Sequence, residues 1–207
     1  MSIVIVKWRT DLAGDSKARM VRSAAALIGT HGLSATSFSD VVSHSGAPRG
    51  SIYHHFPDGK RQLAESAIDW TSNQVLGHLG ACQATTPSDL LACFIDLWRR
   101  SVLASRGSSG CAVAGVAIDI GAFEDDLIGL VRTTFHSWVS ELARRLHELR
   151  VPSDRARSIA FTAVAGMEGA LILCRAEGSS RPLEAVAVEL MRLVPRKTGR
   201  TRRPRAR

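Results

Sequence analysis

Aromatic residues, proline and long apolar runs are scarce in this 207-residue chain. Aromatic residues make up 5% of it and proline occurs 7 times. Proline and glycine fall mostly between apolar stretches, which favours helices over many short strands. No stretch approaches the roughly 18 apolar residues of a membrane span, and the early SIVIVKW is too short for a signal-peptide core. We therefore expect a soluble, cytoplasmic protein with no membrane partner.

Closely spaced cysteine pairs are also missing. The 4 cysteines, Cys82, Cys93, Cys111 and Cys174, include no C-x-x-C pair. This spacing argues against zinc ribbons and redox motifs. The expectation is isolated thiols in a reducing cytosol, with no metal and no cofactor.

Positive charge is concentrated at the end of the sequence. The final RKTGRTRRPRAR carries seven Lys and Arg and no acid, so removing +7 from the net charge of +8 leaves +1 for residues 1–195. A basic segment without apolar periodicity is most simply disordered. We expect residues 196–207 to be a disordered tail that either attracts phosphates non-specifically or has no specific role.

Apolar periodicity and capping signals predict an all-α protein of about nine helices. Ser37 and Asp40 form a capping-box pattern, Gly46 ends the short helix that follows, and Pro48 is expected to open the next one. The segment at 111–120 is a buried helix or strand, and its alanine content favours a helix. The expected helices cover 16–31, 37–45, 49–56, 60 to the high seventies, 88–104, 111–120, 124–149, 154–176 and 182–193.

The first three helices and the tight turn at Gly46 have the organisation of a helix-turn-helix unit. This gives a flexible arm at 1–15, a helix-turn-helix domain at 16–69, a second helical domain at 70–195 and the basic tail at 196–207.

The densest chemical feature is GAPRGSIYHHFPDGK, residues 46–60. On a helix over 49–56, Ile52 and Phe56 face the core while Gly50, Ser51 and His54 lie opposite. Neighbouring helical residues point about 100° apart, so the two histidines do not converge on a metal.

Two other chemical interpretations of the segment also fail. No acid follows to orient a histidine as a catalytic base. Arg61 stands after Lys60 where a phosphate-binding loop needs Ser or Thr.

The remaining interpretation is a DNA-facing surface. Arg49 can reach a guanine edge, Tyr53, His54 and His55 can donate to phosphates, and Lys60 adds a charge. The alternative is a solvated helix with a capping role.

These residues resemble a known family. Residues 17–69, with AAALIGTHG and TSFSDVVSHSGAPRGSIYHHFPDGKRQLAES, closely resemble the DNA-binding domain of tetracycline-repressor-like (TetR family) regulators. The turn FPDGK, and the segments at 110–119 and 166–190, resemble the LmrA/YxaF-like branch. The resemblance implies an N-terminal DNA-binding domain followed by a ligand-binding and dimerisation domain.

With the helix geometry, the resemblance assigns a set of DNA contacts. Ser39 departs from it, because relatives often carry a longer basic side chain there, which weakens a base contact at this position. The assigned residues are Ser37, Ser39, Arg49, Gly50, Ser51, Tyr53, His54, His55 and Lys60.

The second domain carries two further expectations. Small residues in the helix at 154–176, with the helix at 182–193, look like the family's homodimer surface, although both helices could simply close the protomer's own core. A small-molecule pocket would be lined by buried residues that could equally be plain core. Glu168, among them, would meet a cationic ligand or an arginine at the dimer surface. The candidates are Phe94, Trp98, Phe135, Trp138, Met167, Glu168 and Cys174.

The resulting hypothesis is a DNA-binding repressor, not an enzyme. It would bind a pseudo-palindromic double-stranded DNA operator as a homodimer and be released by a small lipophilic effector. One alternative is a helical enzyme acting on small molecules, for which only scattered acids, Asp119, Glu124 and Glu168, are available. Another is a sequence-neutral DNA-binding protein, which the near-neutral body of the chain argues against.

Overall fold

The computed structural model describes residues 16–119 and 125–194, and within those ranges the chain is all-helical. The predicted arm, the tail and Glu124 lie outside the described residues. The helices are α1 (Ser16–His31), α2 (Phe38–Ser45), α3 (Ser51–His55), α4 (Gly59–Ala81), α5 (Pro87–Ala104), α6 (Ala112–Ile118), α7 (Asp125–Glu148), α8 (Ser153–Glu177) and α9 (Arg181–Arg192). The predicted fold class is confirmed, and the described part of the segment predicted at 111–120 forms the helix α6.

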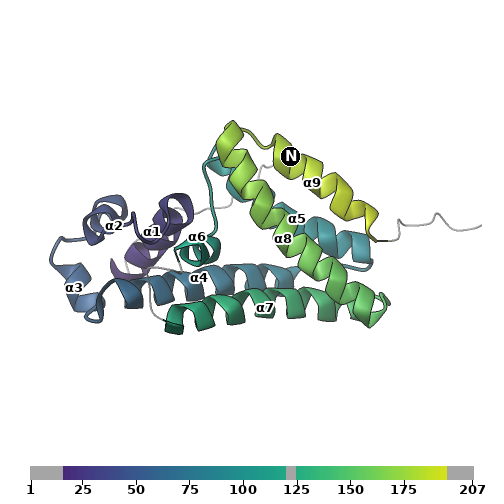
Figure 1. Cartoon of the computed structure of the whole chain (residues 1–207), viewed down its shortest axis with the longest axis horizontal. Coiled ribbons are helices and arrows are strands. Elements are labelled where there is room, and N and C mark those ends of the chain that lie inside the picture. Colours follow the sequence, from purple (N-terminus) through teal and green to yellow (C-terminus); the bar gives the residue numbers. More distant parts are fainter. Residues whose placement is uncertain (1–15, 120–124, 195–207) are drawn as a thin grey trace, which may run out of the picture.

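The first three helices form a compact unit at one end of the molecule (Figure 1). The capping box of α2 is present: the Asp40 amide donates to Ser37 Oγ at 3.1 Å, and the Ser37 amide donates to the Asp40 carboxylate at 2.9 Å. Gly46 ends α2 with a left-handed φ of 64°, a conformation that a side chain disfavours. The turn between α2 and α3 is therefore fixed by local chemistry.

The start of α3 differs from the prediction. The helix begins at Ser51 rather than Arg49, because the Ser51 amide and hydroxyl both donate to the Pro48 carbonyl, at 3.0 and 2.6 Å. These bonds close a turn over Arg49 and Gly50 before the helix starts. As a result Arg49 projects from a turn, not from a helical face.

The long helix α4 connects this unit to the rest of the molecule (Figure 1). Its first half buries Leu63, Ala64, Ala67 and Ile68 on the side that packs against α1. Helix α7 runs alongside α4 (Figure 1), from Arg61, which pairs with Asp126, to the Cys82 carbonyl, which accepts from Arg145, and α5 packs against α4 as well. The predicted division between residues 69 and 70 falls inside α4, so one continuous helix runs through both parts.

The second part is built from α5, α7, α8 and α9, and Trp138 and Phe94 are fully buried in its core. Helix α8 is long and apolar enough, by length and composition alone, to cross a membrane. Its buried residues, from Ala156 to Cys174, instead belong to the core that α8 forms with α7 and α9. A bidentate ion pair from Arg99 to Glu184, with bonds of 2.6 and 2.8 Å, ties α5 to α9.

Helix α6 packs directly on the backbone of α1. A methyl group added at Gly115 would collide with the Ile28 carbonyl, and one added at Gly110 would collide with the Gly29 carbonyl. Glycine is therefore required at both positions because two backbones meet there. We call this the α1–α6 glycine contact.

Two polar links accompany the α1–α6 glycine contact. The Asp119 carboxylate, at the end of α6, accepts the Ser34 amide at 2.8 Å. The Arg175 guanidinium, near the end of α8, donates to the Gly29 carbonyl at 3.3 Å and also to the Thr30 carbonyl. The Arg175 bonds satisfy carbonyls that the end of α1 leaves without a helical partner.

Glu168 is an unusual core residue on α8. Its Oε1 is enclosed and has no hydrogen-bond partner among the described residues. Burial raises the pKa of its carboxyl to about 7, and a hydrogen bond with Cys111 opposes part of that rise. The folded protein thus keeps this carboxyl protonated in a range where an exposed glutamate is ionised.

Replacing Gly115 by alanine should expose the tightness of the α1–α6 glycine contact. We expect Gly115→Ala to lower the free energy of unfolding by about 1–3 kcal/mol, because the added methyl group forces the two backbones apart. Gly77 lies within α4 with open space around it, and Gly77→Ala should raise that free energy by about 0.5–1 kcal/mol. Urea denaturation measures both changes in the free energy of unfolding. The same change in both variants would show that Gly115 is not in a tight backbone contact.

Glu168 should make stability depend on pH in a defined direction. Between the usual pKa of 4.5 and the folded value of about 7, the folded state holds the proton that the unfolded chain releases. The free energy of unfolding therefore falls as pH rises through this window, by up to about 3 kcal/mol. Glu168→Gln should remove that fall. Urea denaturation at several pH values between about 5 and 8, which covers this window, measures it. If the free energies of unfolding of the wild type and the variant differed by the same amount at every pH, the raised pKa of Glu168 would be refuted.

Candidate functional site

The surface of α3 carries exposed polar and aromatic tips over a buried apolar side. Ile52 and Phe56 are each 1% exposed, whereas Tyr53 is 68% exposed. His54, Arg49 and Gly50 are exposed as well. The Tyr53 ring meets Phe38 of α2 edge to face, with centroids 5.5 Å apart. Tyr53 is thus oriented by α2 while its hydroxyl end remains open to solvent.

Two of the predicted DNA contacts are engaged within the protein. His55 Nε2 lies 2.7 Å from Ser16 Oγ, which ties α3 to the first turn of α1. Lys60 Nζ donates to the Ser34 carbonyl at 2.9 Å. Burial lowers the pKa of the Lys60 ammonium, while Asp119 and Asp40 favour its charged form.

The predicted serines also differ from one another. Ser37 caps α2, and its hydroxyl donates to the Asp40 carboxylate at 2.6 Å. That hydrogen bond is the main cause of the lowered pKa of Asp40. The Ser51 hydroxyl is bonded to Pro48, as described above. Ser39 is exposed on α2. Among the nine predicted residues, the exposed side chains that make no hydrogen bond within the described part of the chain are therefore those of Ser39, Arg49, Tyr53 and His54, beside the exposed Gly50.

The predicted effector residues contribute a continuous aromatic chain in the core. The ring centroids of Phe94 and Trp98 lie 6.2 Å apart, those of Trp98 and Trp138 6.1 Å, and those of Phe135 and Trp138 5.3 Å. Trp138 Nε1 donates to Ser72 Oγ of α4 at 3.3 Å. Trp98 Nε1 is buried without a partner in the described part of the chain. Met167 and Cys174 are fully buried on α8.

A surface pocket of about 380 Å³ lies elsewhere, between α5 and α9. Arg99 and Glu184 line it, together with the apolar side chains of Ile95, Val188 and Met191. The predicted effector residues do not line this pocket.

The cysteine prediction is wrong for two of the four residues. Cys82 and Cys93 form a disulfide, while Cys111 and Cys174 are free and buried. The 11-residue separation conceals the pair in the sequence. Cys82 ends α4 and Cys93 lies in α5, so the turn between two packed helices brings them together.

His78 completes a cluster with these two cysteines, and its possible ligand atoms lie within 4.8 Å of theirs. The spacing of His78 and Cys82, four apart on one helix, is the signal that sequence reasoning missed. In this structure the two sulfurs are bonded to each other, so they do not present a pair of thiolate ligands.

Comparisons with known proteins agree with the helix-turn-helix geometry. Residues 21–67 match the family model of bacterial regulatory proteins, tetR family, and residues 87–189 match that of the transcriptional regulator LmrA/YxaF-like C-terminal domain. The HTH-type transcriptional regulator Rv0196 of Mycobacterium tuberculosis is 36% identical over 181 residues, covering 85% of this chain and 92% of the relative. The HTH-type transcriptional regulator LmrA of Bacillus subtilis is 25% identical, with 82% of this chain and 92% of the relative covered.

Solved structures share the fold. A TetR transcriptional regulator from Legionella pneumophila superposes with a TM-score of 0.78 at 22% identity, covering 88% of this chain and 98% of that one. A TetR transcriptional regulator from Chloroflexus aurantiacus gives 0.66 at 27% identity, covering 84% and 91%. The chain therefore belongs to the TetR family of DNA-binding transcriptional regulators, with a C-terminal domain of the LmrA/YxaF-like type.

Proposed function

We propose that this regulator is a homodimeric repressor that binds a pseudo-palindromic operator and is released by a small lipophilic effector. The observation that carries the DNA-binding side is the surface of α3. Tyr53 and His54 stand exposed beside Arg49 and Gly50, on a helix that Ile52 and Phe56 anchor in the core. A protein with this role acts on chromosomal DNA in the bacterial cytoplasm, and its family of regulators gives no reason to assign it an enzymatic reaction.

Within this proposal the nine predicted residues divide into two roles. The open residues Arg49, Gly50, Tyr53, His54 and Ser39 approach the DNA directly. The others, Ser37, Ser51, His55 and Lys60, hold the elements that present them, through the internal bonds described above.

The homodimer would form through α8 and α9. Phe161, Ile172 and Leu173 of α8 are 43%, 53% and 52% exposed, and Val188 of α9 is 52% exposed. Large apolar side chains gathered on two adjacent helices favour burial against a second copy. A dimer would also place two recognition helices on two half-sites, which a single short helix needs for specificity.

The effector would bind next to the aromatic chain in the core. Trp98 Nε1, in that chain, and Glu168 Oε1, on α8 next to Cys111, are buried without partners among the described residues. Buried polar groups without partners are costly, so a ligand that pairs with either would be favoured. The proposed contacts are Phe94, Trp98, Phe135, Trp138, Met167, Glu168 and Cys174.

Release from DNA would pass through the α1–α6 glycine contact. A ligand that shifts α6 or α8 moves α1 with it, because Gly115, Asp119 and Arg175 all contact the end of α1 or the residues just after it. The population would then shift toward a state in which the two recognition helices no longer match the half-sites.

Tyr53→Ala tests the DNA surface. We expect specific operator affinity to fall by about tenfold or more, from a loss of about 1–3 kcal/mol per half-site, while the circular dichroism spectrum stays unchanged because the ring is largely exposed. Gel shift or fluorescence anisotropy with DNA from upstream of its own gene measures the affinity. Leu103→Ala, which trims an exposed side chain of α5, should bind normally. Wild-type affinity in Tyr53→Ala would refute the recognition-helix assignment.

Leu173→Glu tests the dimer surface. Two copies of the new carboxylate would be buried in the interface, so we expect dimerisation to weaken by at least about tenfold, seen by light scattering at micromolar concentration. Leu103 is 59% exposed on α5, so Leu103→Glu serves as a control that should remain dimeric. A monomeric wild-type protein, or equal effects of the two variants, would contradict this surface.

A further inference from the structure

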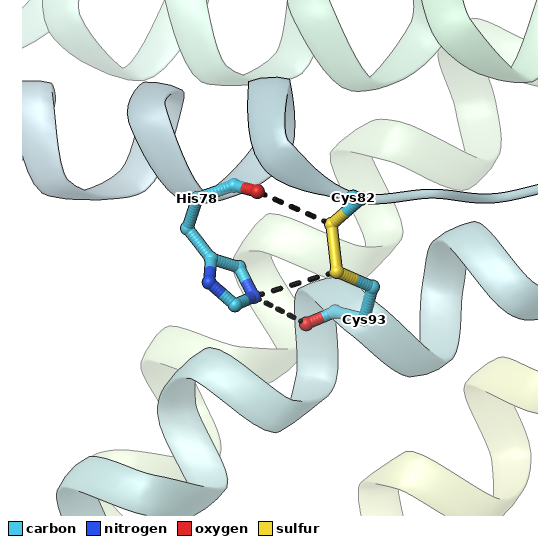
Figure 2. Close-up of side chains that lie close together, drawn as sticks. All are labelled: His78, Cys82 and Cys93. Atoms are coloured by element: carbon cyan, nitrogen blue, oxygen red, sulfur yellow. Dashed lines mark hydrogen bonds between the residues drawn. A yellow bond between two sulfur atoms is a disulfide. The ribbon is translucent and has the colours of Figure 1, made fainter. Parts of the chain in front are cut away.

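The disulfide between Cys82 and Cys93 joins the end of α4 to α5. Cys82 is the residue at which α4 ends, and Cys93 belongs to α5. Their Cα atoms lie 6.2 Å apart (Figure 2). The bond therefore fixes the end of α4 to a helix that also carries Phe94 and Trp98 of the aromatic chain.

His78 is positioned to act on one sulfur of the pair. Its Nε2 lies 2.8 Å from the Cys93 carbonyl oxygen and 3.5 Å from Cys93 Sγ (Figure 2). A carbonyl oxygen only accepts hydrogen bonds, so this nitrogen carries the hydrogen. The same N–H thus stands beside Cys93 Sγ, where a donor stabilises a thiolate over a thiol.

The two sulfurs differ in exposure. Cys82 is 5% exposed, whereas Cys93 is partly exposed. Of the two, Cys93 is therefore the better placed to meet a small oxidant, and the more buried Cys82 to act as its partner. Arg145 of α7 donates to the Cys82 carbonyl at 2.7 Å, which places a guanidinium beside the backbone of Cys82.

The other cysteines lack these features. Cys111 and Cys174 are buried, and burial together with Glu168 holds the pKa of the Cys111 thiol well above its usual value. A buried thiol of this kind is unreactive. Reactivity is thus confined, among the four cysteines, to the pair beside His78.

We propose that Cys93 is a peroxide-reactive thiol, that Cys82 is its resolving partner, and that His78 is the residue that positions a hydrogen-bond donor at Cys93. The Cys93 thiolate attacks one oxygen of hydrogen peroxide, the O–O bond breaks, and a water leaves after protonation. The Cys82 thiolate then attacks the Cys93 sulfur of the sulfenic acid, the S–O bond breaks, and a second water leaves. Two thiols and one hydrogen peroxide become one disulfide and two waters, with two electrons passing to the peroxide oxygens.

The state of this pair would be transmitted along α4. The helix carries the disulfide at one end, and residues from Leu63 to Ile68 in its first half belong to the core beside α1. Closing the bridge limits the positions that the end of α4 can take against α5. The link from this bond to DNA affinity rests on the repressor function proposed above, whereas the thiol chemistry does not.

The first experiment uses the full-length protein and needs no DNA. The protein is reduced with dithiothreitol, freed of reductant, exposed to hydrogen peroxide, and alkylated for mass spectrometry. We expect a peptide pair joined through Cys82 and Cys93 that has lost two hydrogen atoms, while Cys111 and Cys174 are alkylated only after unfolding. Oxidation at Cys111 or Cys174 before this pair closes would overturn the proposal. So would a reduced protein that retains stoichiometric zinc and closes the bridge only after chelation.

Variants separate the three roles. Cys82→Ser should accumulate Cys93 sulfenic acid, trapped by dimedone, and Cys93→Ser should form no sulfenic acid at the site. His78→Phe should slow bridge formation by about tenfold, with the pH at which the rate is half-maximal moved upward, because the N–H beside the sulfur is lost. If His78→Phe formed the bridge at the wild-type rate and with the wild-type pH profile, the proposed role of His78 would be refuted.

Two further readouts test the consequence for the fold and for DNA. The oxidised protein should melt at a temperature higher by roughly 5–10 °C than the reduced protein, and Cys93→Ser should show no such difference.

Operator affinity should differ between the two redox states by about fivefold or more, again only when both cysteines are present. Bridge formation with identical operator affinity in both states would leave the thiol chemistry standing and overturn the regulatory role. If neither redox state bound operator DNA, the proposed repressor function would be refuted, and the thiol chemistry would not be affected.

Discussion

The approach of α6 to α1 through Gly110 and Gly115 constrains the rest of the molecule. Because the added methyl groups would meet carbonyl oxygens of Ile28 and Gly29, the two backbones touch with no side chain between them. Packed backbones do not deform gradually. A displacement of α6 must therefore move α1 or break the contact.

The α1–α6 glycine contact is, beside the continuous helix α4, a second place where the N-terminal unit meets the rest of the molecule. Asp119 joins α6 to the residues before α2, and Arg175 joins α8 to the last carbonyls of α1. Helix α8 in turn carries the exposed apolar residues of the proposed dimer surface. The orientation of α3 is thus connected, through α1, to the helices that would hold the ligand and the second protomer.

The sequence was most informative where structure depends on near neighbours. The capping box at Ser37 and Asp40, the left-handed Gly46, and the inward side of α3 at Ile52 follow from spacings of a few residues. The prediction that Pro48 opens the third helix was wrong, because Pro48 fits both the first position of a helix and a turn that precedes it. The Ser51 bonds to its carbonyl decide between them.

Contacts between distant segments could not be derived in the same way. Ser16 meets His55 across 39 residues and Ser34 meets Lys60 across 26, so the internal roles of His55 and Lys60 appear only once the helices are packed. The bond between Cys82 and Cys93 depends likewise on how α5 folds back beside α4. Helical periodicity identifies the faces of each helix but not which residues of two helices meet.

Hydrogen–deuterium exchange of the full-length protein, with and without its operator DNA, tests the role of the α1–α6 glycine contact most directly. If the contact transmits the state of α3, the amides of α6 and of the last turn of α1 should exchange more slowly when DNA is bound, together with those of α2 and α3. Slowing confined to residues 37–60 would show that α1 and α6 do not respond to DNA, and would contradict the account.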